Sequence, residues 1–259
     1  MDLAGRKGLV LGIANERSIA YGCAKAMREA GAELAVTYLN EKAEPHVRPL
    51  AEALGARLVL PLDVTREGAM EAVFAEIEAA WGGLDFALHS IAYCPMADLH
   101  GRITDASREG FLEAMDISVH SFLRMARLAE PLMTRGEFAE RSGALLTMSY
   151  YGAEKVVEHY NVMGPVKAAL ESCVRYMAAE LGPRNIRVHA ISPGPIATRA
   201  ASGIAHFDEL MERVRAESPE NRLVSIEEVG RVATFLASEA ASGMTGTVTY
   251  VDAGASIVD

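Results

Sequence analysis

The chain has 259 residues, of which 50% are hydrophobic, and it carries a formal net charge of -10. This composition is typical of a globular protein with a sizeable core and excludes a disordered chain. The acidic balance argues against non-specific nucleic-acid binding, because phosphate backbones attract clustered lysine and arginine. The apolar run near the N-terminus is short and interrupted by glycine, so we expect a cytoplasmic protein without a secretory signal or membrane span.

Short apolar runs alternate with longer segments of helical period along the whole chain. The expected strands, in chain order, are residues 8–11, 33–38, 57–61, 85–89, 144–148, 187–191 and 248–251. The expected helices are residues 18–30, 41–54, 67–80, 107–133, 166–181 and 226–237. This alternation predicts an α/β fold, a Rossmann-like doubly wound parallel sheet of about seven strands with helices on both faces. No linker interrupts it, so we interpret residues 1–259 as a single dinucleotide-binding and catalytic domain.

The first strand, turn and helix carry a nucleotide-binding signal. The strand ends at Gly12, which permits a tight turn, and the helix opens near Ser18, where backbone N–H groups can meet a pyrophosphate. Gly22 is expected to let this helix lie close to the sheet. The spacing departs from GxGxxG, so a plain connecting turn remains an alternative.

Two later strand ends point to the same edge of the sheet. The third strand ends in Leu62, Asp63 and Val64, and the carboxylate there can accept a hydrogen bond from an adenine amino group. The alternative is a helix N-cap for the segment that begins near Arg66. The fourth strand ends in HSIAYCP, a run of small residues that is consistent either with a ligand close to the backbone or with turn chemistry before proline.

Tyr160 and Lys167, separated by six residues, are the most informative pair. On one helix they would share a face, about 10 Å apart along the axis. The lysine could then lower the pKa of the phenol. The alternative is a tyrosine at a helix start and a solvated lysine. Pro165 lies between them, so either the helix begins there with Gly164 as its cap, leaving Tyr160 on the preceding turn, or it is kinked.

Three cysteines, Cys23, Cys94 and Cys173, have no paired spacing, and the seven histidines are scattered. We therefore expect reduced thiols and no metal site.

Five segments together resemble the bacterial enoyl-acyl-carrier-protein reductases of the FabI type, a divergent branch of the short-chain dehydrogenase/reductase family. These segments are GIANERSIAYG, LDVTRE, HSIAYCP, SYYGAEKVVEHYNVMGPVKAAL and HAISPGPIATRAASGI. The most specific element is SY, followed ten residues after its tyrosine by YNVMGxxK. Ordinary short-chain reductases use Tyr-x3-Lys instead, and Tyr151 and Lys155 form a pair of that kind, but it lies too close to the strand-end Ser149. We assign Lys155 to a solvent-facing turn.

The resemblance implies NAD(P)H-dependent reduction of the trans-2 double bond of enoyl thioesters on acyl carrier protein, in fatty-acid elongation. It implies a homotetramer and a substrate lid around residues 193–217. The implied catalytic residues are Tyr150, Tyr160 and Lys167. The implied cofactor-binding residues are Gly12, Ser18, Ile19, Leu39, Asp63, Val64, Ile91, Lys167, Ile196, Ala197, Thr198, Arg199 and Ala200. The implied substrate contacts are Cys94 and Phe207.

Some positions depart from the family pattern. Leu39 replaces a glutamine that is common there, and no acidic residue or arginine occupies that strand end, although Lys42 and Arg48 follow nearby. We therefore favour NADH over NADPH as the cofactor, with NADPH possible. Ala92 stands where the family usually has glycine. Two other functions remain open: a short-chain reductase acting on a carbonyl or specialised lipid, and a non-catalytic nucleotide-binding homologue.

Overall fold

The computed structural model describes residues 1–198 and 206–258. Seven strands pair in parallel in the order β3-β2-β1-β4-β5-β6-β7. The strands are β1 (Lys7–Leu11), β2 (Glu33–Tyr38), β3 (Leu58–Pro61), β4 (Phe86–His89), β5 (Gly143–Met148), β6 (Ile186–Pro193) and β7 (Thr247–Val251). The predicted doubly wound parallel sheet is confirmed.

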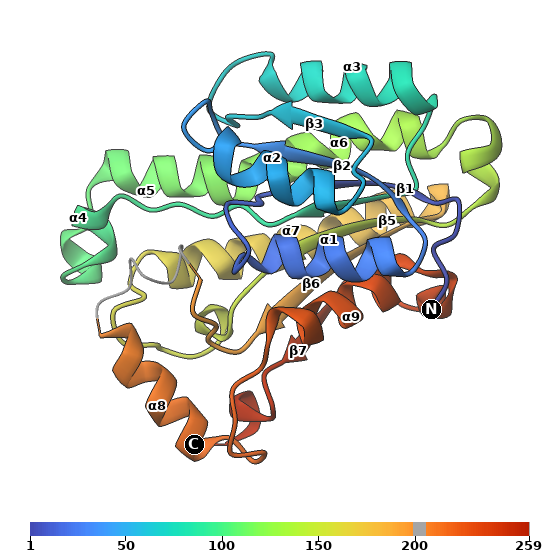
Figure 1. Ribbon diagram of the computed structural model, residues 1–259. Coiled ribbons are helices and arrows are strands. Elements are labelled where there is room, and N and C mark those ends of the chain that lie inside the picture. The colour runs from blue at the N-terminus through green and yellow to red at the C-terminus, as the bar shows by residue number, and fades with distance from the viewer. Residues whose placement is uncertain (199–205, 259) are drawn as a thin grey trace.

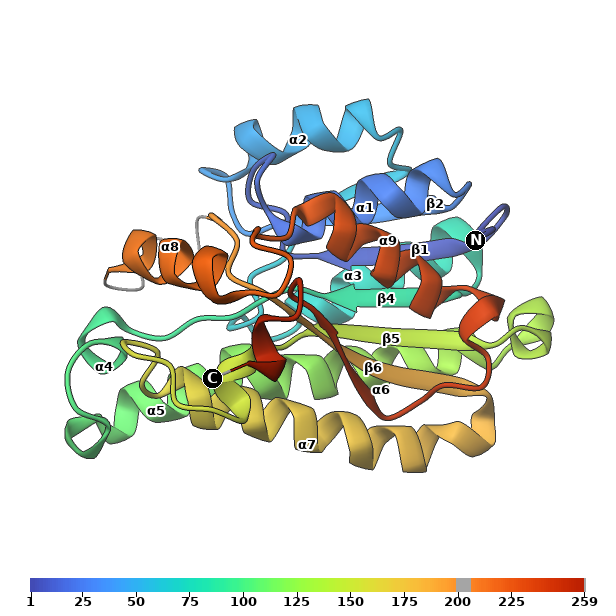
Figure 2. The same ribbon diagram turned by 90° about the horizontal axis from the view of Figure 1, so that it is seen from below.

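Helices cover both faces of this sheet (Figure 1 and Figure 2). One face carries α1 (Ile19–Glu29), α2 (Glu44–Ala53) and α9 (Ile226–Ala237), and the other carries α3 (Ala69–Trp81), α5 (Arg108–Met115), α6 (Ser121–Met133) and α7 (Met163–Leu181). Two more helices, α4 (Met96–Leu99) and α8 (Phe207–Glu217), project at one end of the molecule in both views. Among the described residues, no helix is long and apolar enough to cross a membrane.

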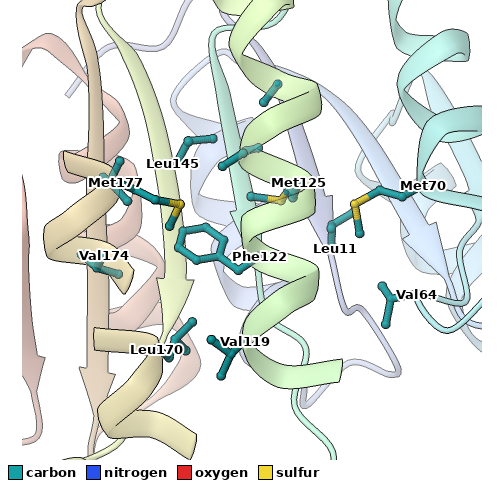
Figure 3. Close-up of a cluster of buried hydrophobic side chains, with 14 of the residues drawn as sticks. Leu11, Val64, Met70, Val119, Phe122, Met125, Leu145, Leu170, Val174 and Met177 are labelled. Carbon is teal, nitrogen blue, oxygen red and sulfur yellow. The ribbon is translucent and has the colours of Figure 1, made fainter. Parts of the chain in front are cut away.

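The strands are apolar on both sides because both sides are covered. Every residue of β5 and β6 is buried, which is typical of strands in the centre of a parallel sheet. Figure 3 shows part of the core between the sheet and the helices α6 and α7, where Phe122 lies among Leu145, Val174 and Met177. This rigid core holds the strand ends from which the candidate site is built.

The single helix predicted for residues 107–133 is wrong in one respect. A π-helical turn, Asp116–His120, separates α5 from α6. Ser107 does begin the segment, because its side chain accepts a hydrogen bond from the backbone N–H of Gly110 at 2.9 Å. A π-turn keeps the chain helical and leaves the apolar period nearly intact, so the sequence pattern does not reveal it.

The strand predicted for residues 187–191 is longer than expected and continues through Pro193. Its pairing with β5 ends at Ile191, and beyond that point only β7 accompanies it. Proline lacks an N–H donor, but it is tolerated where one side of a strand is unpaired. The chain leaves the sheet after Gly194, whose N–H still donates to the carbonyl oxygen of Val251 at 2.9 Å.

Candidate active site

The strand order predicts a cofactor crevice between the ends of β1 and β4. Strand β1 lies between β2 and β4, so the chain winds in opposite directions from this point, and ligands of doubly wound folds bind at such a reversal. Gly12 follows β1 with a φ of 101°, and a Cβ atom added to it would lie 2.1 Å from the backbone oxygen of Ser90, after β4. Only glycine fits this position without displacing backbone.

The turn from Gly12 to α1 is held by Ser18. Its hydroxyl accepts from the backbone N–H groups of Ala14 and Asn15 at 3.3 and 3.4 Å and donates to the carbonyl oxygen of Asn15. Ser18 is buried at the N-terminus of the helix, and Ile19 beside it is half-buried. Ser18 therefore shapes the loop, and the positive end of the α1 dipole faces the crevice.

The expectation for Gly22 is wrong. A Cβ atom there would lie 2.4 Å from the backbone oxygen of Ile226, and one at Gly230 would lie 2.4 Å from the backbone oxygen of Gly22. The glycine therefore brings α1 against α9 rather than against the sheet. A helix on one face of a sheet has helical neighbours as well, and the sequence of α1 alone does not distinguish these contacts.

The ends of β2, β3 and β4 carry other predicted cofactor positions. Leu39 is exposed, Val64 is buried and Ile91 is half-buried. Asp63 accepts from the backbone N–H and hydroxyl of Thr65 at 3.0 and 2.6 Å. The alternative of a helix N-cap is wrong for Asp63, because α3 begins after Gly68.

The segment after β6 carries Ile196, Ala197 and Thr198, which lie in one turn closed by a hydrogen bond from the N–H of Thr198 to the carbonyl oxygen of Ile196 at 2.7 Å. Arg199 and Ala200, the next two predicted cofactor positions, lie outside the described residues.

Tyr160 does not lie on the helix that carries Lys167. Helix α7 begins at Met163 with Val162 as its N-cap, so the shared helical face is wrong and Tyr160 lies on the preceding turn. The prediction that Tyr160 lies on a turn before the helix is confirmed. The helix, however, begins two residues before Pro165, so the proline lies within the first turn of α7. Proline is tolerated there because the first N–H groups of a helix have no helical acceptor.

The backbone around Tyr160 is strained. His159 and Asn161 on either side of it have φ values of 61° and 40°. These values lie in the left-handed region, which residues other than glycine rarely adopt. The side chain of Asn161 donates to the carbonyl oxygen of Asp98 at 3.0 Å, which ties this turn to α4. Strain of this kind occurs preferentially at functional sites.

The two tyrosines form one aromatic pair. The rings of Tyr150 and Tyr160 are 4.9 Å apart between centroids and meet edge to face at 66°. Burial raises the pKa of Tyr150 to about 12, and the nearby charge of Arg213 opposes that shift. Burial, followed by Tyr150 and Cys94, also raises the pKa of Tyr160. This direction is opposite to the lowering expected from Lys167, so both phenols stay protonated and can donate hydrogen bonds at neutral pH.

Lys167 is buried, with 5% of its surface exposed, and its ammonium group donates to the carbonyl oxygen of Met148 at 2.7 Å. Burial lowers its pKa to about 8, while the charge of Glu171 opposes the shift. The alternative of a solvated lysine is therefore wrong. Lys167 places one positive charge at the end of β5, two residues before Tyr150.

A cavity of about 410 Å³ opens beside Tyr150. Helix α8 contributes Leu210, Arg213 and Val214 to its wall, and the loop after β5 contributes Val157. Leu210, Arg213 and Val214 fall within the lid predicted for residues 193–217, but sequence reasoning singled out none of the four residues, because their spacing carries no motif. A partly apolar cavity of this size next to hydrogen-bond donors is typical of a small-molecule site.

The two predicted substrate contacts lie outside that wall. Cys94 is buried in the core beside Tyr160, and burial raises the pKa of its thiol to about 11. Phe207 is the first residue of α8 and is half-buried. All three cysteines of the chain are free, as expected.

Comparison with known proteins gives the family. Residues 12–256 match the family described as Enoyl-(Acyl carrier protein) reductase. The chain is 49% identical over 250 residues to enoyl-acyl-carrier-protein reductase (NADH) 1 of Rhizobium meliloti (strain 1021), across 96% of this chain and 90% of that protein. The chain belongs to the enoyl-acyl-carrier-protein reductase family.

Solved structures of this reductase family share the fold throughout. The crystal structure of enoyl-acyl-carrier-protein reductase (NADH) from Aquifex aeolicus VF5 matches with a TM-score of 0.93 and 47% identity, over 98% of both chains. The reductase from Anaplasma phagocytophilum, solved in complex with NAD, matches with a TM-score of 0.93 and 45% identity, over 99% of this chain and 95% of that chain.

The two candidate lysines differ in burial, although Tyr151 borders the same cavity as Tyr150. Lys155 is exposed on the turn after β5, as predicted, and Tyr151 is half-buried. Lys167, in contrast, is buried and donates to the end of β5. Of the two lysines, only Lys167 is therefore placed to act electrostatically inside the reductase site.

Proposed function

We propose that this chain reduces the trans-2 double bond of enoyl thioesters carried on acyl carrier protein, with NADH as reductant, in fatty-acid elongation. The observation that carries this proposal is the grouping of Tyr150, Tyr160 and Lys167 at the end of β5, beside a partly apolar cavity. Membership of the family supports the same reaction.

The loop after β1 fits a dinucleotide. Gly12 lets the ends of β1 and β4 lie close together, Ser18 orders the turn, and α1 directs its N-terminus toward the crevice. When bound, the nicotinamide cofactor supplies a hydride to the β carbon of the substrate. We assign Lys167 to the nicotinamide ribose hydroxyls. The remaining predicted cofactor positions stay proposals.

The tyrosines meet the charge that the reaction develops. Addition of hydride at the β carbon places negative charge on the thioester carbonyl oxygen, and donors already in position lower the barrier. Tyr160, protonated and buried, is assigned to donate to that oxygen. Tyr150, in edge-to-face contact with it, is the second tyrosine of the site and borders the cavity.

The residues at and after the end of β2 favour NADH over NADPH as the cofactor. A 2′-phosphate requires a cation there, yet Leu39 at that position is apolar and exposed. Arg48 is already held by Glu44, with 2.5 Å between Nη2 and Oε1. We therefore propose NADH as the preferred cofactor.

A steady-state assay with a crotonyl thioester tests the function. We expect the purified protein to oxidise NADH in its presence, and to do so faster than NADPH. Oxidation of either cofactor with ketones but not with the thioester would instead favour the carbonyl-reductase alternative. Cofactor binding without turnover on either substrate would favour a non-catalytic homologue.

We further propose a homotetramer that acts in the cytoplasm on acyl carrier protein. Helix α7 exposes 77% of Tyr176, and α5 exposes the apolar side chains of Phe111 and Leu112. Large exposed apolar groups on neighbouring helices are typical of subunit interfaces. These helices lie on one face of the molecule (Figure 2).

Tyr176→Glu is expected to dissociate this assembly, because it places a carboxylate in an apolar contact. Analytical ultracentrifugation should show four chains of 27.8 kDa for the parent and smaller species for the variant. Ala75→Glu adds the same charge on the exposed side of α3 and should leave the mass unchanged. A parent that sediments as one chain would contradict the proposed tetramer.

A further inference from the structure

A buried carboxylate lies beside the end of β5, close to the proposed catalytic residues. Glu171 is one turn beyond Lys167 on α7 and has 5% of its surface exposed. The hydroxyl of Ser149 donates to its Oε1 atom at 2.5 Å. Ser149 directly follows Met148, whose carbonyl oxygen accepts from Lys167. Two consecutive residues at the end of β5 are thus tied to two residues one turn apart on α7.

Burying the carboxylate of Glu171 costs free energy, which other interactions must offset. A buried carboxylate loses hydration and needs hydrogen bonds or a nearby cation to stay charged. Burial raises the pKa of Glu171, whereas the hydrogen bond from Ser149 lowers it. The carboxylate in turn opposes the effect of burial on Lys167. Each of the two buried charges therefore favours the charged form of the other.

The surrounding groups come from several elements. Glu154, at the turn after β5, disfavours the charged form of Glu171, and Arg175 on α7 favours it. The other titratable groups coupled to Glu171 or Lys167 are Tyr160, Tyr250 on β7 and His89 on β4. Glu171 is the acidic group that acts on Lys167, and it is buried.

We propose that Glu171 is a positioning residue of the reductase site, which anchors Ser149 at the end of β5 and keeps the buried Lys167 ammonium group charged for cofactor binding. The proposal rests on the proposed function in one respect, the assignment of Lys167 to the cofactor. It adds a role for a residue that the reaction itself does not contact.

The first test compares NADH affinity against pH, measured by fluorescence, for the parent and Glu171→Gln. Glutamine keeps the shape and an acceptor for Ser149 but removes the charge. In the parent, affinity should fall as pH rises through about 8, where Lys167 loses its proton. In the variant, we expect this fall to begin about one pH unit lower, so that affinity above both transitions is about tenfold weaker.

Two further variants separate this role from a structural one. Ser149→Ala removes the hydrogen bond to Glu171 and should shift the profile in the same direction by a smaller amount. Glu180→Gln removes an exposed carboxylate from the same helix and should leave it unchanged. If Glu171→Gln weakens NADH binding equally at every pH, the residue is merely structural and the proposal is overturned.

The second test measures the titration of Lys167 directly by NMR, without cofactor or substrate. The chain has five lysines, so their ¹³Cε signals can be resolved after selective labelling, and that of Lys167 is the one missing in Lys167→Met. Its titration should move to lower pH in Glu171→Gln. If Lys167 titrates at the same pH in the parent and in Glu171→Gln, the inference is overturned, even if the parent reduces crotonyl thioester. If the titration shifts but the reductase assay fails, only the proposed function is overturned.

Discussion

Lys167→Met is expected to lower kcat/KM for the enoyl thioester by about a hundredfold. The substitution preserves the length of the side chain but removes both the positive charge at the end of β5 and the proposed contact with the cofactor ribose. Steady-state kinetics with saturating NADH, together with the NADH dissociation constant, measure the effect. A kcat/KM within about tenfold of the parent would contradict the assigned role.

The same variant should not lose stability at neutral pH. Burial lowers the pKa of Lys167 from its ordinary value of 10.5 to about 8, so the folded state penalises the protonated form. The penalty, about 3 kcal/mol, is present below pH 8 and disappears as pH rises toward 10.5. Methionine removes this penalty, and the gain offsets both the lost hydrogen bond and the lost support of Lys167 for the charge of Glu171. The matched control, Lys155→Met on the exposed turn, should leave both activity and stability unchanged.

Gly12→Ala is expected to destabilise the fold and abolish measurable NADH binding. The left-handed φ of 101° alone costs an L-residue about 1–3 kcal/mol. The added Cβ atom would also lie 2.1 Å from the backbone oxygen of Ser90, so the ends of β1 and β4 must separate at the cofactor crevice. Denaturant unfolding and fluorescence titration with NADH measure the two effects.

Gly101→Ala provides the control for backbone strain. Gly101 has a φ of 99°, and an added Cβ atom would meet no atom within 4 Å. This variant should lose only the stability that backbone strain costs and should bind NADH normally. If Gly12→Ala and Gly101→Ala unfolded at the same denaturant concentration and bound NADH equally, the close approach at the crevice would have no role.

Much of the fold was predictable because buried elements follow simple periods. Residues 226–237 and 33–38 coincide with α9 and β2, since a capping serine begins the helix and charged or turn residues bound the strand. The other predicted elements have boundaries within a few residues. The apolar pattern did not predict the helix of residues 207–217 within the expected lid, because none of its residues is buried.

The sequence predicted which strand ends form the site, but it did not predict how the side chains there contact one another. In a parallel sheet the carboxyl ends of the strands meet at one edge, so motifs after β1, β3, β4, β5 and β6 had to converge. Spacing along the chain does not reveal that Tyr160 lies on a strained turn before α7. It also does not reveal that Ser149 donates to Glu171, because that contact joins two elements across 22 positions.

The sequence by itself determined the alternation of strands and helices, the family, and the distinction between Lys167 and Lys155, because periodicity and motif spacing are local properties of the chain. Only the tertiary structure decided the charge states and close contacts. Burial raises the pKa of both tyrosines and lowers that of Lys167, and packing places Gly22 against α9. These effects depend on which atoms surround a group, and distant segments supply those atoms.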